Sequence, residues 1–163
     1  KKILEVGTAV AYSSLVMAEV LEGKTKISTI ENYEKRVLEA RKNIADSNYS
    51  NTIHLIEEDA SKVLKELVEK KEKYDFIFMD AAKGQYINWL EPVIKLLNKE
   101  GVLCSDNVLQ GGDIVQSRYL IERRDRSIHS RLREYLYELT HREELSTTIL
   151  SLGDGVALTV LKK

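Results

Sequence analysis

The sequence predicts a single α/β domain built on a doubly wound sheet of seven strands, mostly parallel, with an antiparallel hairpin at the C-terminal end. Two observations predict this fold. Before residue 106, short apolar runs alternate with longer segments that have helical spacing, which is the pattern of parallel strands joined by crossover helices. After that, two apolar runs flank Gly153-Asp154-Gly155, a typical hairpin turn. At 163 residues, the chain is expected to form one domain, 1–163.

The expected strands are short apolar runs bounded by glycine or polar residues. The run ending at Gly7 is the first, and the run from Lys26 alternates apolar and polar residues, as a strand with one buried face does. The runs before Asp80 and Asp106 indicate strands buried in the middle of the sheet. In chain order, the expected strands are residues 3–6, 26–30, 53–56, 74–79, 102–105, 146–152 and 156–161.

The segments between these runs have apolar residues at helical spacing. Ser13 and Ser14 are expected to open the first helix, and Asp59 to cap the third. Pro92 lies inside the fourth, which is tolerable only if the helix kinks or restarts there. The expected helices are residues 13–21, 33–45, 60–70 and 86–97, followed by a long, charged, mostly helical stretch, 113–140.

Composition excludes several classes of protein. An apolar fraction of 43% with 31% charged residues is typical of a soluble globular domain. No apolar run approaches the length of a membrane span and no signal peptide opens the chain, so we expect no membrane partner. The single cysteine, Cys104, excludes an internal disulfide and indicates a cytoplasmic location.

Polar side chains follow two of the buried strands. Asp80 comes directly after the fourth strand with Lys83 close behind it, and Asp106 and Asn107 follow the fifth. Because open parallel sheets bind ligands at the carboxyl ends of their strands, we expect these groups to share a cleft. Carboxylate and amide oxygens are suitable ligands for Mg²⁺ or a similar cation. The simpler alternatives are a helix cap, an Asx turn and a surface lysine.

The loop after the first strand carries a partial nucleotide-binding pattern. A dinucleotide fingerprint needs three glycines for close approach to a pyrophosphate, and only Gly7 is present, with Ala9 and Ala11 at the later positions. The loop therefore favours a nucleoside ligand without a pyrophosphate, such as S-adenosylmethionine, over a nicotinamide or flavin. The alternative is that Gly7 forms a plain turn between strand and helix.

Two further carboxylates follow the second and third strands. Glu31 lies 24 residues after Gly7 and can accept hydrogen bonds from both hydroxyls of a ribose, unless it is only a solvated residue at a helix start. Asp59 can lie at the edge of an adenine, although a simple N-cap is the preferred interpretation.

Taken together, five motifs resemble the metal-dependent class of S-adenosylmethionine O-methyltransferases, which includes catechol and caffeoyl-CoA methyltransferases. The motifs are ILEVGTAVAYSSL, TIE, DAAKGQY, SDNVLQGG and LGDGVAL, and they extend over nearly the whole chain. The resemblance implies the Rossmann-like fold of class I methyltransferases. The similarity is greatest to a bacterial branch that methylates 5-hydroxyuridine at the tRNA wobble position, because RRDRSIHSRLREYLYEL precedes LSLGDG.

This resemblance implies roles for the matching positions. The ligands of a divalent cation, Mg²⁺ or another, would be Asp80, Asp106 and Asn107. Lys83 would lie beside the substrate hydroxyl, as the base that takes its proton or as a cation that holds the substrate anion, so that Lys83 and Asp80 are the expected catalytic residues. The residues expected to bind the donor are Glu5, Gly7, Thr8, Ser13, Glu31, Asp59 and Asp80.

Two departures from the family pattern accompany the resemblance. Ala11 stands where relatives usually have glycine, which would keep the loop further from the cofactor. The family also has helices before its first strand, whereas here a core strand begins almost at the first residue. We therefore expect that a natural N-terminal segment is absent and that cofactor binding is weakened without it. The family further implies a homodimer.

Three hypotheses for function follow. In the first, Arg123, Arg124 and Arg126 contact anticodon-loop phosphates, and the enzyme converts 5-hydroxyuridine in tRNA to 5-methoxyuridine. In the second, the arginines are only a solvated helix face, and the acceptor is a small catechol-like phenol. In the third, the domain keeps the fold without catalysis and only binds a nucleotide or RNA.

Overall fold

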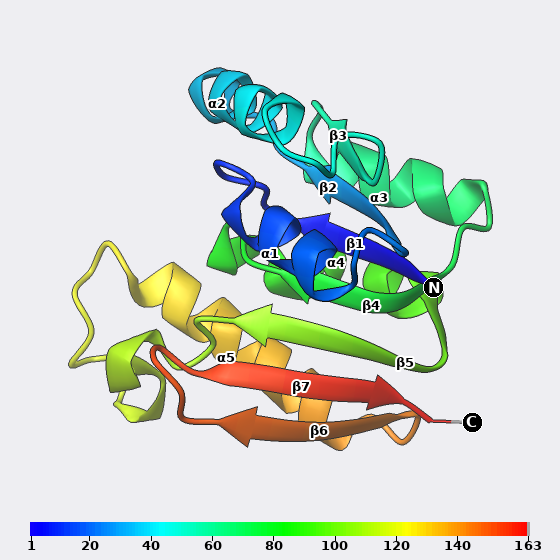
Figure 1. Ribbon diagram of the computed structural model, residues 1–163. Helices are drawn as coiled ribbons and strands as arrows, with labels where there is room; N and C mark the ends of the chain where they lie inside the picture. Colours follow the sequence, from blue (N-terminus) through cyan, green and yellow to red (C-terminus); the bar gives the residue numbers. More distant parts are fainter. Residues whose placement is uncertain (163) are drawn as a thin grey trace.

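The computed structural model describes residues 1–162 and confirms a seven-stranded mixed sheet (Figure 1). The strand order is β3-β2-β1-β4-β5-β7-β6. The first five strands pair in parallel, and β7 lies antiparallel between β5 and β6. The strands are β1 (Lys2–Val6), β2 (Lys26–Ile30), β3 (Ile53–Ile56), β4 (Tyr74–Met79), β5 (Leu97–Asp106), β6 (Leu145–Leu150) and β7 (Val156–Leu161).

Helices cover both faces of this sheet. The helices are α1 (Tyr12–Val20), α2 (Glu34–Ala45), α3 (Ala60–Glu69), α4 (Tyr86–Leu96) and α5 (Arg126–His141), with short 3₁₀ helices η1 (Lys83–Gln85) and η2 (Gln110–Val115). In Figure 1, α1 and α2 lie on one face, and α3, α4 and α5 lie on the other. In residues 1–162, no helix combines the length and the apolar composition that crossing a bilayer requires.

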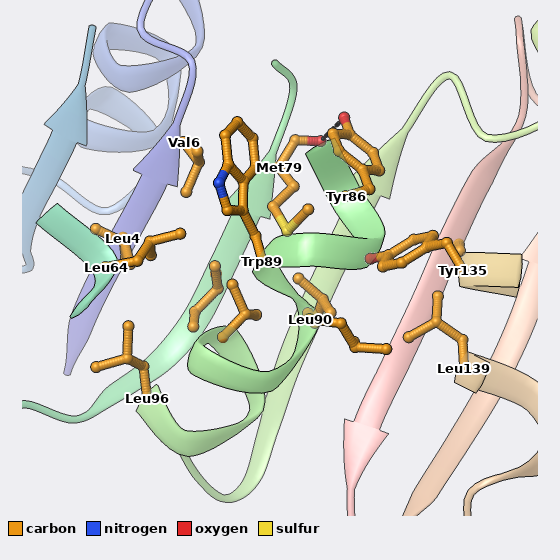
Figure 2. Close-up of a cluster of buried hydrophobic side chains, with 14 of the residues drawn as sticks. Leu4, Val6, Leu64, Met79, Tyr86, Trp89, Leu90, Leu96, Tyr135 and Leu139 are labelled. Carbon is orange, nitrogen blue, oxygen red and sulfur yellow. Dashed lines mark hydrogen bonds between the residues drawn. The ribbon is translucent and has the colours of Figure 1, made fainter. Parts of the chain in front are cut away.

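The core is divided into two clusters by the sheet. Successive residues of a strand point to opposite faces, so Ile3 packs with Ala18 of α1 and Ala40 of α2, whereas its neighbour Leu4 packs with Leu64 of α3 on the other side. Figure 2 shows the larger cluster, in which α4 and α5 pack against the sheet. The central strands are therefore covered on both faces, and their carboxyl ends are held in one rigid edge.

The structure confirms most expected elements and corrects others. Asp59 is the N-cap of α3, since its carboxylate accepts the N–H groups of Ser61 and Lys62 at 2.9 and 3.3 Å. Helix α4 continues through Pro92. The expectation of a mostly helical stretch over 113–140 is wrong for residues 116–125. Gly111 and Gly112, with positive φ angles of 62° and 99°, interrupt the helical backbone inside η2. Residues 116–125 form turns and bends, which the Arg126 guanidinium holds by donating to the carbonyls of Ile121 and Tyr119, and α5 begins only at Arg126.

Candidate active site

A pocket of about 630 Å³ opens at the carboxyl ends of the parallel strands. Its walls come from residues that directly follow β1, β2, β3 and β4, together with Gln85 and Trp89. Gly7, Glu31, Asp59 and Asp80, which the sequence predicts at a ligand site, all line it. The volume is in the range of pockets that bind small molecules and cofactors.

Gly7 allows the loop after β1 to pass directly over the end of β4. Its φ is +105°, and a Cβ atom there would lie 2.0 Å from the carbonyl oxygen of Asp80. The Asp80 N–H donates to the Val6 carbonyl at 3.0 Å, so the two chain segments are also joined. The position therefore needs glycine for close approach and not only for a turn.

Glu31 anchors the same loop from the end of β2. One carboxylate oxygen accepts the N–H of Ala9 at 3.0 Å, and the other accepts the N–H groups of Asn32 and Tyr33 at 3.1 and 3.0 Å. These contacts fix the orientation of the carboxylate and use three of its four lone pairs, so one lone pair, on the oxygen that accepts from Ala9, remains for a hydroxyl of a ligand. Glu31 is 8% exposed and faces the pocket.

Glu5, Thr8 and Ser13 lie beneath the loop and not on the pocket wall. The fully buried carboxylate of Glu5 accepts hydrogen bonds from the hydroxyls of Ser13, Ser14 and Thr29. Burial raises the pKa of Glu5, and these hydroxyl donors partly oppose that shift. The polar groups of these residues have partners within the protein, so they brace the loop, and their direct contact with the donor stays a prediction.

The departure at Ala11 has a conformational basis. Ala11 is the N-cap of α1, has φ 68° and ψ 20°, and is fully buried. This left-handed conformation is one that glycine adopts without strain, whereas another residue loses about 1–2 kcal/mol. The chain keeps the conformation that glycine would have, and the Cβ atom faces the core.

Asp80 and Asp106 lie side by side at the carboxyl ends of adjacent strands. In the parallel pairing of β4 with β5, Met79 faces Ser105, so the next residue on each strand is one of the two aspartates. Neighbouring strands are about 5 Å apart, so the backbones of the two aspartates are neighbours at this edge, and a cation shared by their carboxylates stays a prediction. Asp80 lines the 630 Å³ pocket and Asp106 does not, so Asp80 lies between that pocket and the end of β5.

Lys83 and Asn107 follow these two aspartates closely along the chain. The Lys83 ammonium donates to an Asp80 carboxylate oxygen at 2.7 Å, and its side chain is only 19% exposed, unlike a simple surface lysine. Asn107 has φ 56°, and its N–H donates to Asp106 at 2.8 Å, which leaves the second oxygen of that carboxylate available.

The donor set fits a small hard cation. In residues 1–162, no group of three or more histidine, cysteine, aspartate or glutamate side chains gathers as a metal site. The set at the ends of β4 and β5 instead offers two carboxylates and one amide. Mg²⁺ prefers such oxygen ligands, usually one or two carboxylates, and keeps several of its waters.

Tyr86 connects the ends of β4 and β5 through hydrogen bonds of its hydroxyl, a role that the sequence did not indicate. It is fully buried, and its hydroxyl donates to the Met79 carbonyl at 2.8 Å, with the Asp106 carbonyl at 3.3 Å (Figure 2). The same oxygen accepts from the Lys83 ammonium at 3.1 Å. Burial raises the pKa of Tyr86 far above its ordinary value, so the phenol stays protonated and remains a donor.

We expect Tyr86→Phe to reduce both stability and turnover. The Met79 carbonyl loses its buried partner, which costs about 1–3 kcal/mol in the free energy of unfolding, and Asp80, Lys83 and Asp106 lose a common support. Urea unfolding and methyl-transfer rates measure the two effects.

The matched control for this variant is Tyr135→Phe. Tyr135 is equally buried, and its hydroxyl bonds to Ser105 at 2.6 Å without reaching Asp80 or Lys83. It should lose similar stability and keep its turnover. Equal losses of turnover in the two variants would show that Tyr86 has no special positioning role.

The C-terminal hairpin holds the segment that follows Asn107, which the sequence also did not indicate. Val108 and Leu109 donate through their N–H groups to the carbonyls of Gly155 and Asp154 at 3.0 and 2.9 Å. A Cβ atom on Gly155 would lie 2.3 Å from Leu109, so the hairpin glycine makes room for this contact. The LGDG motif was the available signal, because two glycines flank its turn.

The arginine cluster expected to contact RNA is mostly engaged within the protein. Arg124 pairs with Glu122 at 3.0 Å and Asp125 at 3.4 Å. Arg126 donates to the carbonyl of Ile121 at 3.0 Å and so fixes the preceding loop. Among the described residues, Arg123 alone of the three has a guanidinium without a hydrogen bond or ion pair.

The fold and the site define a class: this is the class I fold of S-adenosylmethionine-dependent methyltransferases, with the ligand pocket at the strand ends. A family model described as O-methyltransferase matches residues 1–163. The chain belongs to this family and is an S-adenosylmethionine-dependent O-methyltransferase.

Individual relatives agree with this assignment. The flavonoid 3',5'-methyltransferase of Vitis vinifera is 33% identical over 97% of this chain and 69% of its own length. The catechol O-methyltransferase of Niastella koreensis is 30% identical over 71% of this chain and 52% of its own. The crystal structure of a Bacillus cereus O-methyltransferase with SAH superposes with a TM-score of 0.87 at 27% identity, covering 99% of this chain and 74% of that one.

These findings support the broad family and not the tRNA branch. None of the three proteins is named for a tRNA substrate, and two are named for phenolic acceptors. The specific similarity to a tRNA 5-hydroxyuridine methyltransferase therefore gains no support. The choice of acceptor depends on the chemistry of the site.

Proposed function

We propose that this chain transfers the methyl group of S-adenosylmethionine to a hydroxyl of a small catechol-like phenol, with a divalent cation held by Asp80, Asp106 and Asn107. The observation that carries the proposal is the position of Asp80, which borders the donor pocket on one side and stands next to Asp106 on the other. Donor and acceptor would therefore meet above the end of β4.

The 630 Å³ pocket is the proposed donor site. Glu31 would accept a hydrogen bond from a ribose hydroxyl, and the loop at Gly7 would bring backbone close to the ligand. Asp59, already the cap of α3, would lie near the adenine edge. The relative from Bacillus cereus that binds SAH supports this assignment.

Methyl transfer from a sulfonium is an in-line displacement. The acceptor oxygen gives up its proton to solvent water and forms a bond to the methyl carbon, while the carbon–sulfur bond breaks with its electron pair on sulfur. A bound divalent cation supplies positive charge that lowers the pKa of a nearby hydroxyl. Lys83, an ammonium that already donates to Asp80 and Tyr86, would stabilise the negative charge on the acceptor oxygen. Positioning by these rigid strand ends lowers the barrier further.

A transfer assay with three acceptors tests the proposal. The chain is incubated with methyl-labelled S-adenosylmethionine and Mg²⁺, and with catechol, with phenol or with tRNA that carries 5-hydroxyuridine at the wobble position. We expect transfer to catechol, little to phenol because it lacks a second adjacent oxygen, and loss of transfer when EDTA removes the cation. Transfer to tRNA with none to catechol would contradict the proposal.

A tRNA acceptor is the second candidate, because 5-hydroxyuridine also offers two neighbouring oxygens. The Arg123 guanidinium, which has no hydrogen bond or ion pair within residues 1–162, would contact a phosphate of the tRNA. Reversing the charge with Arg123→Glu should leave catechol methylation unchanged and should lower any transfer to tRNA. The proposed homodimer can be checked by light scattering of the purified chain.

A further inference from the structure

A second hollow, of about 430 Å³, lies beside the first turns of α5. It is lined by Ser117, Arg118, His129, Ser130 and Arg133, none of which lines the 630 Å³ pocket. The lining combines two guanidinium groups, two hydroxyls and an imidazole, and it contains no carboxylate. Such a surface is positively charged and rich in hydrogen-bond donors.

His129 is the unusual member of this group. It is 1% exposed, and within residues 1–162 neither of its ring nitrogens has a hydrogen-bond partner. An imidazole always carries at least one N–H donor, and a buried polar group without a partner costs about 1–3 kcal/mol. His129 lines the hollow, but both ring nitrogens have almost no accessible surface, so the imidazole is a reporter of binding beside the hollow and not a donor to its occupant.

The two arginines can contribute further donors. The Arg118 guanidinium is exposed and has no hydrogen bond or ion pair among the described residues. Arg133 donates through one nitrogen to the carbonyls of Ile114 and Gln116 at 3.3 and 3.5 Å, and a guanidinium has five N–H groups, so most of its donors remain available.

The hydroxyls differ in what they can offer. Ser130 donates its proton to the carbonyl of Arg126 at 2.9 Å, so this proton is committed. Within residues 1–162, the Ser117 oxygen accepts only a long contact of 3.5 Å from the Tyr119 N–H, and its proton is not engaged. The hollow therefore presents donors from Ser117, Arg118 and Arg133 to a common occupant.

We infer that this hollow binds a phosphoryl group. A phosphate carries three or more acceptor oxygens and close to two negative charges, which match several convergent donors and two planar guanidinium forks. Its source is either free inorganic phosphate or a phosphate ester on a larger ligand. The inference does not rest on methyl transfer, because the hollow is separate from the donor pocket and binding is measured directly.

Imidazole NMR tests the inference on the intact chain. Long-range proton–nitrogen spectra resolve the three histidines while inorganic phosphate or phenyl phosphate is added at constant ionic strength. We expect saturable shifts of the His129 ring and none for His54 or His141, which lie outside the hollow. If phenyl phosphate binds as tightly as phosphate, the site accepts an ester. If only phosphate binds, the site accepts the free anion.

Arg118→Gln and Arg123→Gln form a matched pair for the same titration. Both residues are exposed and each substitution removes one charge, but only Arg118 lines the hollow. We expect Arg118→Gln to weaken phosphate binding about tenfold or more and Arg123→Gln to leave it unchanged. Equal weakening by both variants, parallel shifts of all three histidines, or equally tight binding of acetate would overturn the inference.

Discussion

Replacing Asp106 by alanine should strongly reduce cation-dependent methyl transfer while leaving donor binding intact. Asp106 stands beside Asp80 at the end of β5 but does not line the donor pocket. Loss of one of two carboxylate ligands removes most of the electrostatic stabilisation that the cation would supply, so kcat with catechol should fall about 10²–10³-fold. Calorimetry with SAH should give the same affinity as the unchanged chain.

Two further variants test whether the expected effect on kcat alone is specific to Asp106. Asp113→Ala removes an exposed carboxylate in η2 and should change neither kcat nor donor affinity. Asp80→Ala should lower both, because Asp80 belongs to the pocket and to the cation site. If Asp106→Ala lost donor affinity to the same degree as Asp80→Ala, the division of the site between β4 and β5 would be wrong.

Gly7→Ala should cause the largest loss of stability of the substitutions considered. The new methyl group would lie 2.0 Å from the Asp80 carbonyl oxygen, and that atom belongs to the backbone and cannot rotate away. Strain at φ +105° alone costs about 1–3 kcal/mol, and displacement of the β4 end adds to it. We expect a total above about 3 kcal/mol in urea unfolding, together with loss of SAH binding, because Asp80 must move.

Gly112→Ala separates the clash from the backbone strain. Gly112 has a similar φ of +99°, but a Cβ atom there would meet no atom within 4 Å. Its loss of stability should be about 1 kcal/mol and SAH binding should be unchanged. A Gly7 variant no less stable than the Gly112 variant would contradict the close approach of the loop to β4.

Local pattern was sufficient for the elements and for the position of the polar residues along the chain. Apolar runs located β2, β3 and β4 at their observed bounds, and Asp59 was correctly interpreted as a helix cap. The same reasoning failed at 116–125. There the charged residues are compatible with a helix, but the Arg126 side chain donates to the backbone carbonyls of Ile121 and Tyr119, which holds an irregular loop.

Other features of the site depend on contacts between residues distant in the sequence. Three contacts join separate elements. The buried Glu5 carboxylate accepts from three hydroxyls, and the Tyr86 hydroxyl bonds to the Met79 and Asp106 carbonyls. Gly155 lacks a Cβ atom, which leaves space for the Leu109 side chain. No periodicity in one segment reports such pairings, because they arise only when strands and helices pack.

The sequence by itself determined which residues stand at strand ends, because strand periodicity and turn residues are local properties of the chain. Only the tertiary structure decided which ends are neighbours. The order β1-β4-β5 puts Gly7 against Asp80 and Asp80 beside Asp106. Strand order and register follow from burying both faces of the sheet at once, which is a property of the whole folded chain.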